Sequence, residues 1–141
     1  VVDRRPVEGD YLMVMMGGRP GALKKVNTGK GALLGLTPYS GETVHDAVVL
    51  IFTEEIGHRN TRTCETVAHE IAHAFGADHS RLCSDVMTYK RSCVKMQTFR
   101  DKDAKCGEYE ERPCKDGQPT QNSHRILLET LGPSGVRAKS G

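Results

Sequence analysis

The chain has 141 residues, a net charge of +2 and 37% hydrophobic residues. This length suits a single domain, residues 1–141, with one modest core. The charge is too small to indicate a nucleic acid or a membrane surface as partner, and no apolar run approaches the ~20 residues of a membrane-spanning helix, so we expect neither nucleic-acid binding nor membrane insertion.

The N-terminal half contains three short segments that are typical of β-strands. Residues 10–16 form an apolar run that ends at a Gly-Gly-Arg-Pro sequence. Residues 32–38 contain a glycine and stop at a proline, which is typical of an edge strand. Residues 47–52 are the most strongly apolar run of the chain, and we predict that they form a central strand.

A helix is predicted after the third strand, beginning near Thr61 or Thr63, either of which can cap it. The apolar positions that recur at helical spacing are Val67, Ile71, Ala74 and Phe75. They predict one buried face, which argues against the alternative of a surface helix whose charged residues merely face water.

This helix carries the pattern H-E-x-x-H-x-x-G-x-x-H from His69 to His79. Residues four apart lie on one helix face, so His69 and His73 can present two imidazoles to one metal ion, with Glu70 beside it. Gly76 allows a left-handed turn that returns His79 towards the same ion. Three neutral nitrogen ligands with one open position are typical of catalytic zinc. We therefore expect one Zn²⁺, held by these three histidines.

A final helix is predicted over residues 123–131, with Ser123 as its cap and Gly132 as its stop. The residues expected to face inward are Ile126, Leu127 and Leu131. The tail, residues 133–141, is predicted to be disordered.

Five cysteines favour a disulfide framework over reduced core thiols. Four of them lie between Cys83 and Cys114, in the polar C-terminal half, so we expect a secreted, extracellular protein. Reduced thiols in a cytosolic protein are the alternative. The odd number leaves one cysteine free or paired outside the chain, and the lack of a C-x-x-C pair disfavours a second zinc site.

These residues resemble those of the metzincin zinc peptidases. In that family the zinc-binding histidines lie above a turn that contains a methionine, and here Met87 follows His79 at an interval of eight. That short interval is most similar to the matrixin branch. The segment Cys83-Ser84-Asp85-Val86-Met87 is also similar to the snapalysins, in which an aspartate replaces the third histidine.

The resemblance implies an α+β catalytic domain with a twisted mixed sheet, an edge strand for substrate, an active-site helix, a Met-turn and a C-terminal helix. An upper subdomain, residues 10–79, would hold the sheet and the zinc-binding helix, and a lower one, residues 80–132, the Met-turn and the last helix. The three predicted strands correspond to the last three of the family sheet. We therefore expect that the N-terminal part of the usual fold is missing.

The resemblance also implies a zinc-dependent endopeptidase that hydrolyses peptide bonds by direct attack of a zinc-bound water. Glu70 would take the proton of the water and pass it to the leaving amine. Met87 would form an apolar floor beneath the histidines. Tyr89 lies at the offset from the methionine at which some metzincins have a tyrosine near the oxyanion, and packing in the pocket wall is its alternative role.

Substrate is expected to lie extended along the edge strand and to pair with it backbone to backbone. The strand residues concerned are Leu33, Leu34, Gly35 and Leu36. Selectivity would come from a pocket walled by the residues after Met87, among them Thr88 and Lys90. Expected partners are thus a protein or peptide substrate and, from the family, a propeptide or protein inhibitor, and we expect a monomer.

The snapalysin likeness implies a Cys83–Cys93 disulfide, and Cys106–Cys114 is then the natural second bridge, which leaves Cys64 unpaired. Calcium, held by carbonyl oxygens and Asp46 or Glu54, is left open as an additional ion.

Two other functions stay open. The first is an inactive zinc-binding module that holds a peptide or an inhibitor in the same cleft, against which the intact Glu70 argues. The second is a zinc hydrolase for amides of small molecules, against which the open edge strand argues.

Overall fold

Strand β3 (Ala47–Ile51) is the centre of the sheet in the computed structural model, which describes Arg4 and residues 11–23, 32–90 and 94–133. Strand β1 (Leu12–Met16) pairs with β3 in parallel, and β2 (Gly35–Leu36) pairs with it antiparallel on the other side. The order β1-β3-β2 confirms the predictions of a central strand near residues 47–52 and an edge strand before it.

Strand β2 is shorter than residues 32–38, because only Gly35 and Leu36 pair with β3. After them, the hydroxyl of Thr37 donates to the backbone carbonyl of Glu70 at 3.0 Å. Pro38 then has no N–H to offer a ladder. The edge strand thus turns away from the sheet and is fastened to the helix below it.

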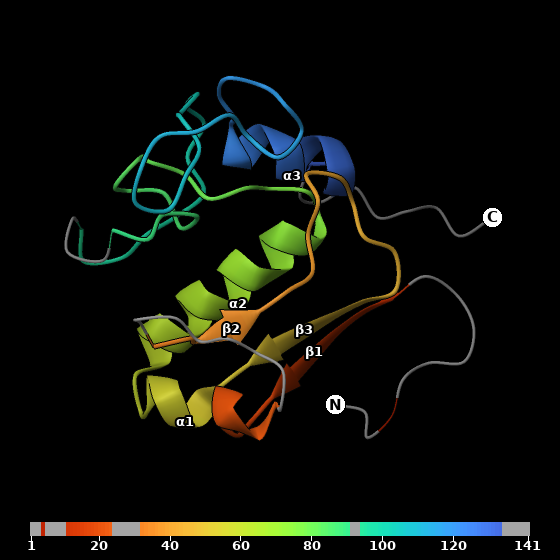
Figure 1. Ribbon diagram of the computed structural model, residues 1–141, viewed down its shortest axis with the longest axis vertical. Helices are drawn as coiled ribbons and strands as arrows, with labels where there is room; N and C mark the ends of the chain where they lie inside the picture. Colours follow the sequence, from red (N-terminus) through yellow and green to blue (C-terminus); the bar gives the residue numbers. More distant parts are fainter. Residues whose placement is uncertain (1–3, 5–10, 24–31, 91–93, 134–141) are drawn as a thin grey trace.

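In the described part of the chain, three α-helices complete a small mixed α/β domain (Figure 1), which is consistent with the expected α+β class. They are α1 (Thr53–Ile56), α2 (Asn60–Ala74) and α3 (Ser123–Leu131), and a single 3₁₀ turn, η1 (Pro20–Ala22), follows β1. Helix α1 was not predicted, because four residues are too few to show a helical period. Among the described residues, no helix is both long and apolar enough to cross a membrane.

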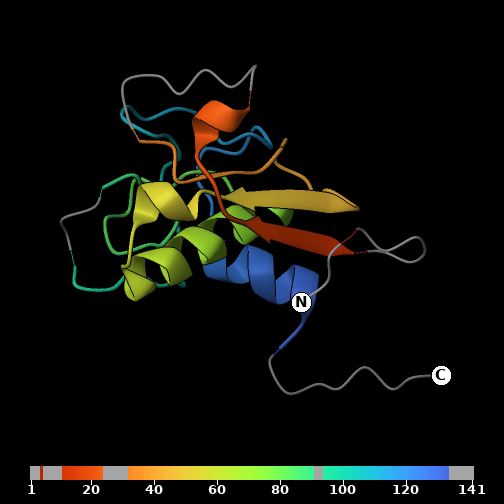
Figure 2. The ribbon, with the colours of Figure 1, turned by 90° about the horizontal axis from the view of Figure 1, so that it is seen from below.

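Helix α2 is the middle layer of the domain, between the sheet and α3 (Figure 2). On one side Val67 and Ala74 pack with the sheet residues. On the other, Ala68 and Ala72 belong to a cluster with Ile126 and Leu127 of α3. Small alanines on this second face let the neighbouring segments approach the helix closely, so α2 is packed on both faces.

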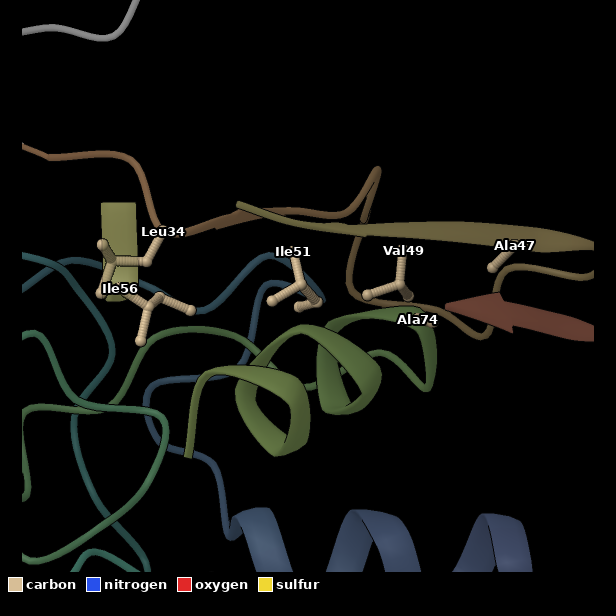
Figure 3. Close-up of a cluster of buried hydrophobic side chains, with 6 residues drawn as sticks. All are labelled: Leu34, Ala47, Val49, Ile51, Ile56 and Ala74. Atoms are coloured by element: carbon tan, nitrogen blue, oxygen red, sulfur yellow. The ribbon is translucent and has the colours of Figure 1, made fainter. Parts of the chain in front are cut away.

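The sheet face that covers α2 forms the main core, whose buried side chains Figure 3 shows. Val49 and Ile51 point from β3 towards the helix and are 0% and 1% exposed, and Ile56 of α1 closes the end of the cluster at 0%. Full burial of a side chain of this size contributes about 1.5–3 kcal/mol to stability. This packing fixes the position of α2 and, with it, of the first two histidines.

The predicted threonine cap of α2 is wrong. The helix begins at Asn60, and Arg59 is its N-cap residue without a side-chain hydrogen bond. The hydroxyls of Thr63 and Thr66 instead donate to the carbonyls of residues four positions earlier, Arg59 and Arg62. A threonine inside the first turns can always make this bond, so its presence alone does not mark a helix start.

Helix α3 has the predicted bounds, but its cap is Asn122, whose side-chain oxygen accepts from the N–H of Arg125 at 2.9 Å. Ser123 is buried and donates to Asp85 instead, at 2.8 Å. Leu131 was expected to face inward and is 60% exposed, because the helix ends there and Gly132 turns away with φ of 77°. Residues 134–141 of the expected tail lie outside the described residues.

The segment between the last histidine and α3 is almost entirely loop (Figure 1). Isolated bridges hold it, among them Ser80 with Cys106 and Ala104 with Gln121. Such a segment carries no periodic signal, and its fold depends on individual hydrogen bonds. It nevertheless supplies several groups around the three histidines.

Candidate metal centre

Three histidines meet at the C-terminal end of α2. His69 and His73 are four residues apart on the helix, and His79 follows the turn at Gly76, whose φ is 92°. Nε2 of His73 lies 3.0 Å from Nε2 of His69 and 3.0 Å from Nε2 of His79. A Cβ at Gly76 would also lie 3.1 Å from the carbonyl oxygen of Gly41. The predicted convergence of the three imidazoles is therefore confirmed, and Gly76 makes it possible.

The outer nitrogen of each ring fixes its tautomer. Nδ1 of His69 lies 2.9 Å from the carbonyl oxygen of Val86, and Nδ1 of His73 lies 2.7 Å from that of Ala77. A carbonyl only accepts, so both Nδ1 atoms carry the proton and donate it. Nδ1 of His79 donates in the same way to the carboxylate of Glu108, at 2.6 Å. Each Nε2 is thus left with a lone pair.

The short contacts between the Nε2 atoms cannot be hydrogen bonds, because no proton lies between two lone pairs. Burial, followed by His69 and His79, lowers the pKa of His73 well below its usual value, and burial also lowers that of His79. Neutral rings whose lone pairs converge repel one another unless a cation lies between them. The three residues therefore form a group that could hold a metal ion.

Glu70 lies beside this group, 7% exposed, between α2 and strand β2. It is so close to β2 that a Cβ at Gly35 would lie 2.6 Å from its Oε1 and 2.5 Å from its Cγ. Burial raises the pKa of Glu70 to about 7, which the hydrogen bond from Thr37 partly opposes. The strand thus leaves room for this carboxyl group only because residue 35 is a glycine.

Met87 is fully buried beneath the helix, in one cluster with Ala72, Ala77 and Val86. The segment 80–87, here called the methionine turn, closes through a hydrogen bond of 2.9 Å from the N–H of Ser80 to the carbonyl of Met87. The carboxylate of Asp85 accepts from the N–H of Met87 at 3.0 Å. The turn also presents the carbonyl of Val86 to His69, so it orients a histidine as well as filling the core.

Two tyrosines flank the imidazoles. Tyr39 stacks on His73 with ring centroids 4.2 Å apart, and its hydroxyl donates to Asp78 at 3.2 Å. Tyr89, expected near the site, has its ring centroid 4.4 Å from that of His79. Sequence reasoning did not find Tyr39, since it lies 40 positions before His79 in a loop without a pattern. A chemical role for the Tyr89 hydroxyl stays a prediction.

Asp78, Glu108 and Arg112 form an ionic cluster behind His79 that the sequence did not reveal. Arg112 donates to Asp78 at 2.5 and 2.8 Å and to Glu108 at 2.8 Å. Burial opposes ionisation of both carboxyl groups, but hydrogen bonds outweigh it and lower the pKa of each to about 2. Arg112 donates to both groups. In addition, the backbone N–H of His79 donates to Asp78, and the ring of His79 donates to Glu108. Both groups are therefore carboxylates at neutral pH.

A groove of about 390 Å³ lies beside the three histidines and is lined by one of them, His69. Strand β2 and the residues before it form one wall, α2 the second, and the segments after the methionine turn the third. Its lining residues are Ala32, Leu33, Leu34, Gly35, Arg62, Glu65, Thr66, His69, Glu70, Val86, Thr88, Tyr89, Gln97, Glu108 and Tyr109. Of the residues predicted to bind substrate, Leu36 and Lys90 lie outside this lining. Tyr109, which is 79% exposed beside Tyr89, was not predicted.

The predicted disulfide Cys106–Cys114 is present, and Cys64 is a free, exposed thiol. Cys83 is disulfide-bonded, but its predicted partner Cys93 lies outside the described residues. A disulfide is compatible with an extracellular protein. Of the carboxylates considered for calcium, Glu54 pairs with Arg19 at 2.8 Å, and calcium binding stays a prediction.

Comparisons with known proteins do not add to this description. A scan against protein-family models, a search of curated proteins and a search of solved structures find no match.

Proposed function

We propose that the chain is a zinc-dependent endopeptidase of the metzincin type. The observation that carries this proposal is the convergence of three Nε2 lone pairs beside Glu70, next to a groove that His69, Glu70 and an edge strand line. Ligands 2.0–2.1 Å from a tetrahedral zinc ion lie about 3.3 Å from one another, close to the 3.0 Å between the nitrogens here. Bound zinc would polarise a peptide carbonyl and lower the pKa of water to about 7.

Glu70 is the group placed to move the proton. Its carboxyl group lines the groove next to His69, yet it is held against Gly35 and is not one of the three converging ligands. It would accept a proton from the attacking water and donate it to the leaving amine. No acyl-enzyme is needed for this route, so Glu70 serves as both base and acid.

Strand β2 offers the substrate a backbone to pair with. Within the described residues it pairs only with β3, and the residues from Ala32 to Gly35 line the groove. An extended peptide added along such an edge gains main-chain hydrogen bonds with little demand on sequence. This arrangement supports a peptide over a small amide. The position of β2, second in the chain but at the edge of the sheet, also agrees with the metzincin resemblance.

The test is hydrolysis of a quenched, mixed-sequence peptide library by the zinc-loaded chain, by its metal-free form and by a Glu70→Gln variant. We expect cleavage by the zinc-loaded chain alone, recovery of the metal-free form when zinc is added back, and a loss on the order of 10²–10⁴-fold in Glu70→Gln despite unchanged zinc content. Zinc binding without cleavage would point instead to the inactive binding module, and cleavage of small amides but not peptides to the other hydrolase.

A further inference from the structure

Glu108 sets the third histidine apart from the other two. His69 and His73 donate to backbone carbonyls at 2.9 and 2.7 Å, whereas His79 donates to a carboxylate at 2.6 Å. A hydrogen bond to a charged acceptor is shorter and about twice as strong as a neutral one. His79 needs this support most, because it lies beyond the end of α2 and the helix does not fix its ring.

Arg112 holds the Glu108 carboxylate from behind. One guanidinium nitrogen lies 2.8 Å from Oε1 and another 3.3 Å from Oε2, and the same group spans both oxygens of the buried Asp78. A planar guanidinium fixes the orientation of a carboxylate better than a lysine would. Asp78 is in turn held by the N–H groups of His79 and Lys115, at 2.7 and 2.9 Å. The acceptor of His79 is therefore rigidly placed.

The loop that carries Glu108 is itself closed on two sides. The Cys106–Cys114 disulfide joins its ends, and the N–H of Arg112 donates to the carbonyl of Cys106 at 3.0 Å. Further on, the N–H of Gly107 donates to the carbonyl of His79 at 3.0 Å, which binds the loop to the ligand's own backbone. These bonds keep Glu108 next to His79 without help from a helix or strand.

A direct metal ligand is the other role that Glu108 could have, because Asp78, His79 and Glu108 also bring their ligand atoms within 4.8 Å of one another. The guanidinium of Arg112 already lies between these two carboxylates and pairs with both, which offsets one of their two negative charges. A second cation there would be repelled by Arg112. The carboxylate of Glu108 therefore acts on the metal centre through His79.

We propose that Glu108, oriented by Arg112, is a positioning residue of the metal centre. It holds His79 in the tautomer whose Nε2 is free, aims that lone pair at the ion and makes the ring a better donor. The inference rests on the proposed zinc site and deepens it. Glu108, 29 positions after His79 in the sequence, would help this third ligand to retain the metal.

The test is the zinc dissociation constant of the full chain, measured by competition with a chromophoric chelator. We expect Glu108→Ala to weaken binding about 10–100-fold. Glu108→Gln keeps an oxygen that can accept from Nδ1 but loses the charge, so its affinity should lie between those of the alanine variant and the parent chain. Glu111→Ala removes an exposed carboxylate from the same loop and should bind like the parent. Any other order of affinities overturns the proposal.

A second arm separates positioning from general weakening of the fold. In a His79→Ala background, Glu108→Ala should leave the remaining zinc affinity unchanged, since its effect passes through that ring. A fall as large as in the parent background overturns the proposal. With Co²⁺ in place of zinc, the visible bands of Glu108→Ala should shift and those of Glu111→Ala should not.

The outcomes also separate this inference from the proposed function. A parent chain that binds no zinc overturns both. A parent chain that binds zinc and cleaves peptides, with Glu108→Ala and Glu108→Gln of equal affinity to it, overturns only the role of Glu108. If the alanine variant does not fold, Glu108→Gln decides, and parental affinity in that variant rejects the proposal.

Discussion

Gly35 is the residue on which the geometry around Glu70 depends most directly. Its backbone is that of an ordinary strand, so a side chain is excluded by its neighbour and not by its torsion angles. The three nearest atoms to an added Cβ all belong to the Glu70 side chain, at 2.5 to 2.7 Å. Contacts this short require either Glu70 or the strand to move.

We therefore expect Gly35→Ala to lower kcat/KM on the order of 10²-fold, because Glu70, the proposed general base, is displaced. Zinc affinity should be unchanged, since the three histidines do not touch this position. The matched control is Gly21→Ala, where nothing lies within 4 Å of an added Cβ, and its kinetics should equal those of the parent chain. Parental kcat/KM in Gly35→Ala would show that Glu70 is not the base, or that it tolerates displacement.

At the same scale, the sequence predicted the residues that a local pattern connects and missed those that it does not. His69, His73 and Glu70 follow from a helix repeat. His79 follows from a glycine turn three residues earlier, and all four belong to one eleven-residue segment. Glu108 and Arg112 lie in a loop with no period and reach Asp78 and His79 only through the folded chain. Such partners require the tertiary structure.

Among the elements, the three strands and the helices α2 and α3 were predictable in kind and less so at their ends, whereas the four-residue helix α1 was not predicted. The apolar run of β3 predicted the central strand of the sheet, and the proline after β2 predicted an edge strand. The caps of α2 and α3 were harder to predict, because they depend on which of several polar residues has a tertiary partner. Ser123 illustrates this: its hydroxyl binds Asp85 in the methionine turn, so Asn122 caps the helix. The contact between Ser123 and Asp85 therefore determines which residue caps α3.

The contact between Ser123 and Asp85 also predicts that the stability of the fold depends on pH. Burial raises the pKa of Asp85 above its usual 3.8, although the N–H of Met87 and the hydroxyl of Ser123 favour its charged form. A carboxyl group with a higher pKa in the folded than in the unfolded state costs stability as the pH rises above about 4. The free energy of unfolding of Asp85→Asn should thus increase relative to that of the parent chain as the pH rises above about 4. Urea unfolding of the metal-free proteins at several pH values measures the difference in unfolding free energy between Asp85→Asn and the parent chain. A difference that decreases as the pH rises contradicts the prediction.

For the whole molecule, the candidate metal centre joins three parts of the chain: helix α2, the methionine turn through Val86, and the loop that carries Glu108. Without a cation, the three lone pairs at its middle repel one another. Metal removal should therefore weaken the entire fold.

We expect chelation to lower the free energy of unfolding, and with it the urea concentration at the unfolding midpoint. The loss should be about 4 kcal/mol relative to a sample in which free zinc is a thousand times its dissociation constant. In His79→Ala, the chelator should have much less effect, because the third ligand is gone. Equal midpoints of the parent chain with and without chelator would mean that no metal binds the folded form preferentially.

The small loop closed by Cys106 and Cys114 has a consequence for where and when the protein matures. The disulfide closes the loop that carries Glu108, the acceptor for His79. Under the proposed role of Glu108, the redox state of the two cysteines would therefore affect how well the neighbouring histidines retain zinc. In a reducing compartment the open loop would leave His79 less supported and zinc easier to lose. An oxidising environment, in which the disulfide persists, would in the same way favour zinc retention.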